Sequence, residues 1–446
     1  RYGGFTFHRF TKNEDQVDWI LSASYRIPKV ETGTVFSYYE YPPLASAPVV
    51  NIGALLSLTG DNATLGVQLE KTLHMASQDL NAYLQRNYSA NARVQLTVAD
   101  TASDPQTALA KMQELHGQGI ERFIGPLTSR ELQAVSAYAD ANQLMVISPS
   151  STSMDLAVED TIYRLSLNNE KMAKALAKYF VDNGVAFVQP VYRDDNYGTD
   201  FVNTFVEHYL ADGGMCGEGI AYDANLPEFG FVMDSLTHAL IPAMAEYGSK
   251  KTVVLLISLD EGISLFHSIP QDSILRQVRW FGGDGLAGNA SLVNDAMALQ
   301  FALDTKLITF SPGNRSHDFL GIFERAWRDV LAETIEETPT TFSYMTYDAA
   351  WFLTMASVKE AYNGEEVSRK DTLVDLVNHT QGAFQFYRFN DVGDTQFGYT
   401  DFYMFEEYEG DYYWTLFAKY SYQITGENLY YAVPKEDTQV ESWELY

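Results

Sequence analysis

The chain has 446 residues, of which 46% are apolar and 20% charged, and 59 acidic against 30 basic residues give it a net charge of −29. This length exceeds one ordinary hydrophobic core, so we expect two or more ordered lobes, and the acidic excess disfavours binding to nucleic acids and to anionic membranes. No apolar run approaches the roughly 18 residues of a membrane span.

Residues 1–47 differ in character from those that follow. They are rich in aromatic residues that alternate with other side chains, as in 34–41, which predicts antiparallel β-hairpins. We expect any leader sequence to precede Arg1, outside this numbering.

From Val49 onward, strands and helices are predicted to alternate. The apolar run at 49–55 predicts a strand, and a turn at 59–62 separates it from a long helical pattern that ends near Arg86. The rest of this first series comprises strands at 94–98, 122–124 and 144–147 and helices at 104–116 and 131–141. Strands joined by crossover helices predict a parallel sheet with helices on both faces.

A second series begins near Glu170 and predicts a second α/β lobe. It comprises helices at 170–182, 199–210 and 231–247, strands at 185–188, 219–222, 252–257 and 278–281, and a short helix near Ile263. After a further strand at 307–310, helices are predicted at 317–331, 342–362 and 371–379. Residues 384–422 are aromatic-rich with turn signals at 390–393 and 409–411, which predicts antiparallel hairpins.

Two segments near opposite ends of the chain have similar sequences. GGFTFHRF at 3–10 matches GAFQFYRF at 382–389 with a shift of 379 positions, and 36–41 matches 417–422 with a shift of 381. The nearly constant shift predicts that residues 1–47 end a preceding copy of the domain. The alternative is that aromatic hairpin strands simply resemble one another.

The sequence carries no catalytic or metal-binding signature. Cys216 is the only cysteine, which excludes an internal disulfide and a multi-cysteine metal site. No two of the eight histidines lie within four residues of each other, which argues against local zinc motifs. Motifs of serine hydrolases, P-loop proteins and zinc proteases are absent as well. We therefore expect no metal, no cofactor and no enzymatic activity.

Seven short motifs carry a resemblance to a known family. In chain order they are Leu58-Thr59-Gly60 with Gly66, TASDP at 101–105, IGPLTS at 124–129, ISPSST at 147–152, DNYG at 195–198, GGDG at 282–285 and TYDAA at 346–350. From Val49 to about Tyr422, their order and spacing resemble the extracytoplasmic solute-binding proteins of ABC importers, specifically the leucine/isoleucine/valine-binding type.

This resemblance implies the two-lobed α/β fold of type I periplasmic binding proteins, in which each lobe is a parallel sheet with helices on both faces and the chain crosses between the lobes three times. It places lobe one at 49–168 plus 312–388 and lobe two at 169–311 plus 389–422, with 423–446 as a tail or linker. It also implies that a small ligand binds in the cleft between the lobes, outside the cytoplasm. Hinge closure around the ligand would then produce a closed form that the membrane subunits of an importer recognise.

Hydroxyl side chains are predicted to hold a carboxylate. Ser129 precedes a helical pattern, whose free N–H groups and dipole favour an anion. Ser150, Ser151 and Thr152 follow a buried strand, where open α/β sheets bind ligands. In the resembled family these two loops hold the α-carboxylate of the ligand. The alternative is that these residues cap helices.

Asp284 is predicted to hold an ammonium group. It lies between glycines after a strand, and in the resembled family an acidic residue in this loop binds the α-ammonium. The alternative is an ordinary turn aspartate. Residues 283–288 also match a dinucleotide-binding pattern, GDGLAG, but a carboxylate within it would repel phosphates.

The resemblance assigns two further residues to the cleft. Tyr197 matches an aromatic residue of the second lobe that covers the ligand, with core packing as the alternative. Leu65 matches a first-lobe residue that lines the side-chain pocket, where an aliphatic residue fits an apolar ligand side chain.

The chain departs from the family at two places, which leaves the ligand open. It has Asn168-Asn169 where an aspartate is frequent, and Ser258-Leu259 where a tyrosine commonly helps to hold the ammonium. Asn169 is kept as a candidate ligand residue. We expect a small amino acid or a related molecule, including one without a free α-ammonium group. The alternative function is the sensing ectodomain of a receptor with the same fold.

Overall fold

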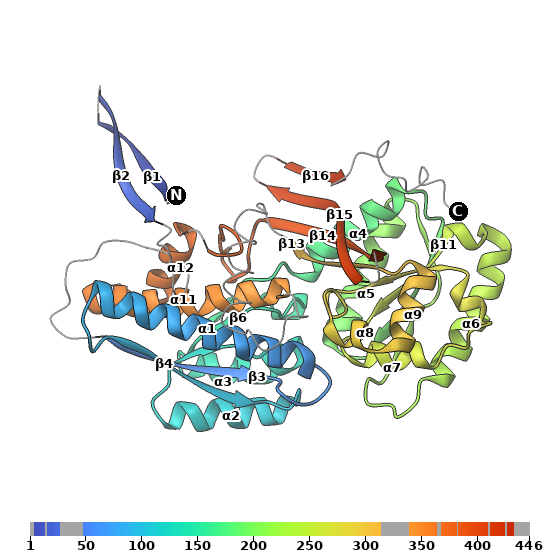
Figure 1. Cartoon of the computed structure of the whole chain (residues 1–446), viewed down its shortest axis with the longest axis horizontal. Helices are drawn as coiled ribbons and strands as arrows, with labels where there is room; N and C mark the ends of the chain where they lie inside the picture. The colour runs from blue at the N-terminus through green and yellow to red at the C-terminus, as the bar shows by residue number, and fades with distance from the viewer. Residues whose placement is uncertain are drawn as a thin grey trace.

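The computed structural model describes residues 4–13, 16–26, 48–313, 339–363, 367–380, 382–408, 411–423 and 426–431 (Figure 1). Most of these residues form two α/β lobes, each built on its own sheet. The helix predicted at 317–331 lies outside the described residues.

Lobe one is a five-stranded parallel sheet, ordered β4-β3-β5-β6-β7, between two layers of helices. Its strands are β3 (Val49–Leu56), β4 (Arg93–Asp100), β5 (Arg122–Ile124), β6 (Met145–Ser148) and β7 (Ile162–Arg164). One face packs against α1 (Ala63–Asn87), α11 (Thr341–Asn363) and α12 (Arg369–Asn378), and the other against α2 (Pro105–Gly117) and α3 (Ser129–Ala141). The inner strand β6 is buried along its whole length, which explains its unbroken apolar run.

Lobe two contains a nine-stranded sheet, ordered β10-β8-β11-β12-β13-β14-β15-β16 with β9 beside β8. The parallel strands are β8 (Phe187–Arg193), β9 (Met215–Cys216), β10 (Ile220–Tyr222), β11 (Thr252–Ile257), β12 (Arg279–Gly282) and β13 (Ile308–Gly313). The antiparallel strands are β14 (Gly398–Tyr408), β15 (Asp411–Gln423) and β16 (Gly426–Tyr431). One face packs against α4 (Asn169–Asp182) and α5 (Asn196–Ala211), and the other against α6 (Gly230–Tyr247), α7 (Glu261–His267), α8 (Ala290–Asn294) and α9 (Ala296–Thr305).

The chain crosses between the lobes three times, as predicted. It leaves lobe one between β7 and α4, returns between β13 and α11, and leaves again between α12 and β14. Arg164 at the end of β7 secures the last crossing, because its Nε and Nη2 atoms lie 2.7 Å from the two carboxylate oxygens of Asp394. Both side chains are 2% exposed, and this two-pronged geometry offsets the cost of burying the charges.

The aromatic segment at 384–397 corrects one expectation, because it forms only isolated bridges and no hairpin. Asp348 of α11 organises it instead. The Asp348 carboxylate accepts hydrogen bonds from the Ala383 and Phe384 N–H groups at 2.5 and 3.0 Å and from the Tyr387 hydroxyl at 2.9 Å. The hairpins begin only at β14, and they extend beyond Tyr422 into the expected tail, where β16 pairs with β15.

Near the N-terminus, β1 (Gly4–Asn13) and β2 (Gln16–Arg26) form an antiparallel pair and join no other described strand. GGFTFHRF therefore lies mostly in a strand, whereas GAFQFYRF is irregular. The two segments share sequence without sharing local structure, and a preceding copy of the domain stays a prediction.

Candidate ligand-binding site

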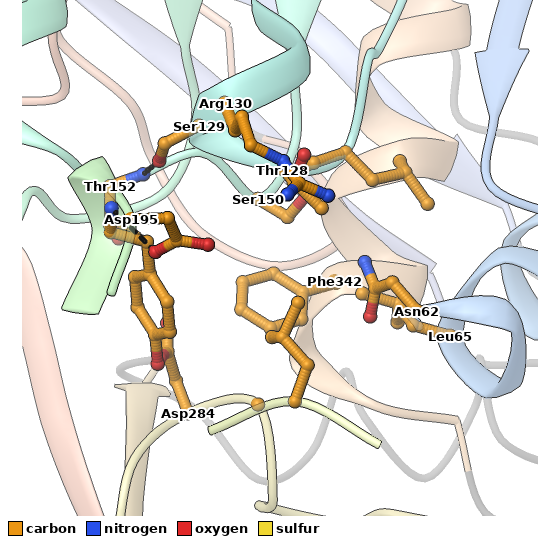
Figure 2. Close-up of a pocket in the computed structure, with 14 residues that line it drawn as sticks. Asn62, Leu65, Thr128, Ser129, Arg130, Ser150, Thr152, Asp195, Asp284 and Phe342 are labelled. Carbon is orange, nitrogen blue, oxygen red and sulfur yellow. Dashed lines mark hydrogen bonds between the residues drawn. The ribbon is translucent and has the colours of Figure 1, made fainter. Parts of the chain in front are cut away.

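The candidate site residues gather where the two lobes face each other. Ser129 begins α3 and Ser150 follows β6 in lobe one, whereas Tyr197 lies in α5 and Asp284 follows β12 in lobe two. All four line one pocket with about 420 Å³ of empty space, part of it open to solvent (Figure 2). We call it the cleft pocket.

Ser129 does not cap α3, although capping was the alternative. Thr128 is the N-cap, and it forms a reciprocal capping box with Glu131. The Ser129 Oγ instead accepts hydrogen bonds from the backbone N–H groups of Thr152 and Ser153, both at 3.2 Å. Because its lone pairs are occupied, the hydroxyl proton remains available to a ligand.

Thr152 offers a second hydroxyl donor. Its side chain is 1% exposed, and within the described part of the chain its Oγ1 atom has no hydrogen-bond partner. Leaving a buried hydroxyl unpaired costs about 1–3 kcal/mol, which a ligand carboxylate would recover. Ser129 and Thr152 thus form a corner with two donors beside the N-terminus of α3, where the helix dipole also favours an anion.

Ser150 and Ser151 both donate away from the ligand. Their Oγ atoms donate to the Leu127 carbonyl at 2.7 and 3.3 Å. Ser150 lines the cleft pocket, and because its proton is engaged it presents an acceptor to a ligand. Ser151 is 1% exposed and does not line the pocket, so the structure places it as a support of the loop.

Asp284 and Tyr197 meet at the lobe-two wall of the cleft pocket. The Tyr197 hydroxyl donates a hydrogen bond to the Asp284 Oδ1 atom, and both side chains are more than nine-tenths buried. Burial raises the pKa of Asp284 to about 6, although the Tyr197 hydrogen bond opposes the rise, and burial also raises the pKa of Tyr197. A buried carboxylate that lines a pocket is suited to an ammonium group.

The glycines beside Asp284 are explained by close packing. A Cβ atom at Gly285 would lie 2.3 Å from the Ser258 carbonyl oxygen, and one at Gly283 would lie 2.9 Å from the Tyr197 hydroxyl. The loop thus brings Asp284 against its neighbours and needs no phosphate to account for its glycines.

The cleft pocket is also lined by residues that had not been predicted as site residues, and three of them add chemistry of their own. Phe342 at the start of α11 adds apolar surface, and Asn62 and Arg130 add polar groups. Figure 2 shows Phe342 between the lobes, with Asn62 and the predicted Leu65 together on one side. The sequence gives no signal for Asn62 or Phe342, because a residue before a helix is typical of a cap and an aromatic residue within an apolar helix is typical of a core.

Asn169 lies outside the pocket lining. It is fully buried at the start of α4, and its Nδ2 atom donates to the Asp200 carboxylate of α5 at 2.6 Å. The structure therefore places Asn169 between two helices of lobe two, and a ligand role for it stays a prediction.

A buried arginine joins the two lobes beside the cleft pocket. Arg193 at the end of β8 is 1% exposed, and its guanidinium lies 2.8 Å from Asp61 of lobe one. Asp195 and Glu261 of lobe two lie 2.6 and 3.1 Å from the same group. Burial alone would lower the pKa of Arg193, but the three carboxylates raise it above its ordinary value. Among these three, only Asp61 is supplied by the opposite lobe.

The described residues contain neither a candidate metal site nor a helix that could span a membrane. No group of His, Cys, Asp and Glu side chains among them could hold a metal ion. None of the helices they form combines the length and the apolar character needed to cross a membrane.

The comparisons with known proteins agree with this geometry. The family model described as "Receptor family ligand binding region" matches residues 68–384, which include most of both lobes. The chain belongs to this family. The chain is also similar to an uncharacterized protein of Methanocaldococcus jannaschii. The two are 26% identical over 310 residues, which cover 68% of this chain and 71% of that protein.

Two solved structures of similar fold are those of binding proteins. A leucine-binding protein, LivK of Thermotoga maritima, is similar with a TM-score of 0.65 at 16% identity, covering 82% of this chain and 97% of that one. A solute-binding protein of an ABC transporter from Rhodopseudomonas palustris, in complex with p-hydroxybenzoic acid, has a TM-score of 0.68 at 15% identity and covers 84% and 98%. The prediction of a type I periplasmic binding protein of the leucine/isoleucine/valine-binding type is confirmed. This member of the receptor ligand-binding family binds a solute.

Proposed function

We propose that the chain binds a free α-amino acid in the cleft pocket, outside the cytoplasm, and delivers it to the membrane subunits of an ABC importer. One observation carries the choice of ligand. Two hydroxyl donors, Ser129 and Thr152, lie on one side of the pocket, and the buried carboxylate of Asp284 lies on the other (Figure 2). The donors suit a carboxylate and Asp284 suits an ammonium group, and an α-amino acid presents both from one carbon atom.

The ligands of the structural neighbours differ in one informative respect. Leucine and p-hydroxybenzoic acid share a carboxylate, but only leucine carries an ammonium group. In this chain a ligand without an ammonium group would leave the Asp284 carboxylate buried with neutral partners, the Tyr197 hydroxyl and the backbone N–H groups of Asp284 and Gly285. Burying a charge without an opposite charge beside it is costly, which favours an amino acid over an aromatic acid.

A thermal-shift screen tests this choice, because a ligand that binds only the folded state raises the melting temperature. The screen compares the twenty amino acids with α-hydroxy acids of matching side chain and with p-hydroxybenzoate. We expect at least one amino acid to raise the melting temperature and its hydroxy analogue to have little effect. Equal shifts for both would overturn the role of Asp284, and a shift with p-hydroxybenzoate alone would move the function to aromatic acids.

Delivery to an importer is the second part of the proposal, and sensing is its alternative. Both use the same closure, which a ligand drives through its higher affinity for the closed form. Two proteins of similar fold are solute-binding proteins of ABC transporters, which supports delivery. The test is an ATPase assay with importer membrane subunits encoded next to this protein. Stimulation by the loaded protein supports delivery, whereas binding of the loaded protein to a neighbouring kinase or chemotaxis receptor instead would support sensing.

A further inference from the structure

Asn62 is a buried polar residue at the cleft pocket. It is 5% exposed, and its backbone is fixed by bonds from its N–H to the Ser103 Oγ atom and from the Gly66 N–H to its carbonyl. Among the described residues, nothing forms a hydrogen bond with its side-chain amide. Figure 2 shows this amide directed into the cleft pocket, beside Leu65.

This orientation is unusual for the position that Asn62 occupies. Asparagine is among the best N-cap residues, because its side chain accepts the N–H of the second or third helical residue. Asn62 is the N-cap of α1 and makes no such bond. The N–H of Thr64 is taken instead by the Asp260 carboxylate of lobe two, at 2.9 Å. Because Asp260 caps α1 from across the cleft, the Asn62 amide is free to face the ligand.

A second pocket continues from the cleft pocket past Asn62. It has about 430 Å³ of empty space, part of it open to solvent, and it shares Asn62, Leu65, Asp284, Gly285 and Phe342 with the first. The residues that line only this second pocket include polar side chains and one charged residue, Asp260. No lysine or arginine in the described part of the chain lines it. A ligand whose carboxylate and ammonium are held in the cleft pocket would extend its side chain into this space, alongside the Asn62 amide.

We propose that Asn62 reads a hydrogen-bonding group on the ligand side chain, so that the site selects amino acids with an uncharged hydroxyl or amide side chain over aliphatic ones of the same shape. The inference rests on the proposed function, which it narrows. An aliphatic side chain would displace water from the amide and leave it unpaired, and a site built to form a hydrogen bond rejects an analogue that lacks it. An acidic side chain would meet the Asp260 carboxylate and be repelled.

Two isosteric ligand pairs test the inference: threonine against valine, and asparagine against leucine. We expect calorimetry with the wild-type protein to show at least one polar member binding about 10- to 100-fold more tightly than its aliphatic partner. In Asn62→Leu this ratio should fall to about one or invert. Asn142→Leu makes a similar change at the exposed C-terminal end of α3 and should keep the wild-type ratio.

The outcomes separate the inference from the function on which it rests. Valine or leucine binding as tightly as the polar partner would overturn the role of Asn62 and leave amino-acid binding intact. A polar preference that survives Asn62→Leu would also overturn it. Failure of every amino acid to bind the wild-type protein would overturn the proposed function itself. If Asn62→Leu does not fold, the wild-type ratios can still overturn the inference.

Discussion

Asp61 of lobe one and Arg193 of lobe two form an ion pair between the lobes, with 2.8 Å between the Oδ2 and Nη2 atoms. Arg193 is also held by Asp195 and Glu261 of its own lobe, so opening the cleft removes only the bond to Asp61. The pair therefore stabilises the closed form without needing a ligand.

Replacing Asp61 should shift the lobes toward the open form. Asp61→Asn keeps the size of the side chain but loses the charge, so we expect a larger radius of gyration for the unliganded protein in small-angle scattering. Ligand affinity should fall about 3- to 10-fold, as for the loss of one partly buried pair. Asp182→Asn removes an exposed pair with Lys178 inside α4 and is the matched control. If the two variants behave alike, the interlobe pair contributes nothing to closure.

Ligand binding should depend on pH through Asp284. Burial raises its pKa to about 6, and only the ionised carboxylate pairs with an ammonium group. Affinity should therefore be full at pH 8 and fall as the pH drops through about 6. Asp284→Asn should weaken binding at pH 8 by about 10- to 100-fold and flatten the profile, while the melting temperature of the unliganded protein stays level or rises. Calorimetry between pH 5 and 8 checks this, and an unchanged profile in the variant would exclude Asp284 as the titrating group.

Removing the Tyr197 hydroxyl should move that profile. Its hydrogen bond lowers the pKa of Asp284, so in Tyr197→Phe the pKa rises further and the loss of affinity begins at a higher pH. Tyr209→Phe is the matched control, because Tyr209 lies in the same helix and its hydroxyl donates to the Val185 carbonyl at 2.7 Å, away from the pocket. A midpoint that stays in place in Tyr197→Phe would show that the hydroxyl does not tune Asp284.

Asp79 should destabilise lobe one at alkaline pH. Burial raises its pKa to about 7 against the opposing effect of its 2.8 Å hydrogen bond from Tyr347. Because the folded state then binds the proton more tightly than the unfolded state, the free energy of unfolding rises as the pH falls from above 7 toward 4. Asp79→Asn should increase the free energy of unfolding at pH 8 by about 1–3 kcal/mol and change it little at pH 4. Urea denaturation of the unliganded protein measures both, and a less stable variant at pH 8 would mean that Asp79 is ionised and stabilising.

The order of elements in both lobes could be predicted from the sequence, because buried strands and amphipathic helices leave periodic patterns. β11 was predicted to the residue and α6 to within one. β8 was not, since Gln189-Pro190 interrupts its apolar run although the strand continues to Arg193 between β10 and β11. The segment at 384–389 has the composition of a strand. It is irregular instead, because the carboxylate of Asp348, distant in sequence, accepts the backbone N–H groups at its start.

The site was predictable where it depends on a single loop. Ser129, Thr152 and Asp284 each follow a strand or begin a helix, and local sequence marks such positions. Asn62 and Phe342 were missed because their place depends on contacts distant in sequence. Asn62 faces the pocket only because Asp260, 198 positions further along the chain, takes over the capping of α1.

That borrowed cap makes the first turn of α1 sensitive to the distance between the lobes. When the cleft opens, the Thr64 N–H loses its acceptor at Asp260 and turns to water. The rate at which this amide exchanges with deuterium therefore depends on how much of the time the cleft is open. The measurement needs neither a label nor a mutation. A single backbone proton thus reports the fraction of time that each molecule spends closed, with or without its solute.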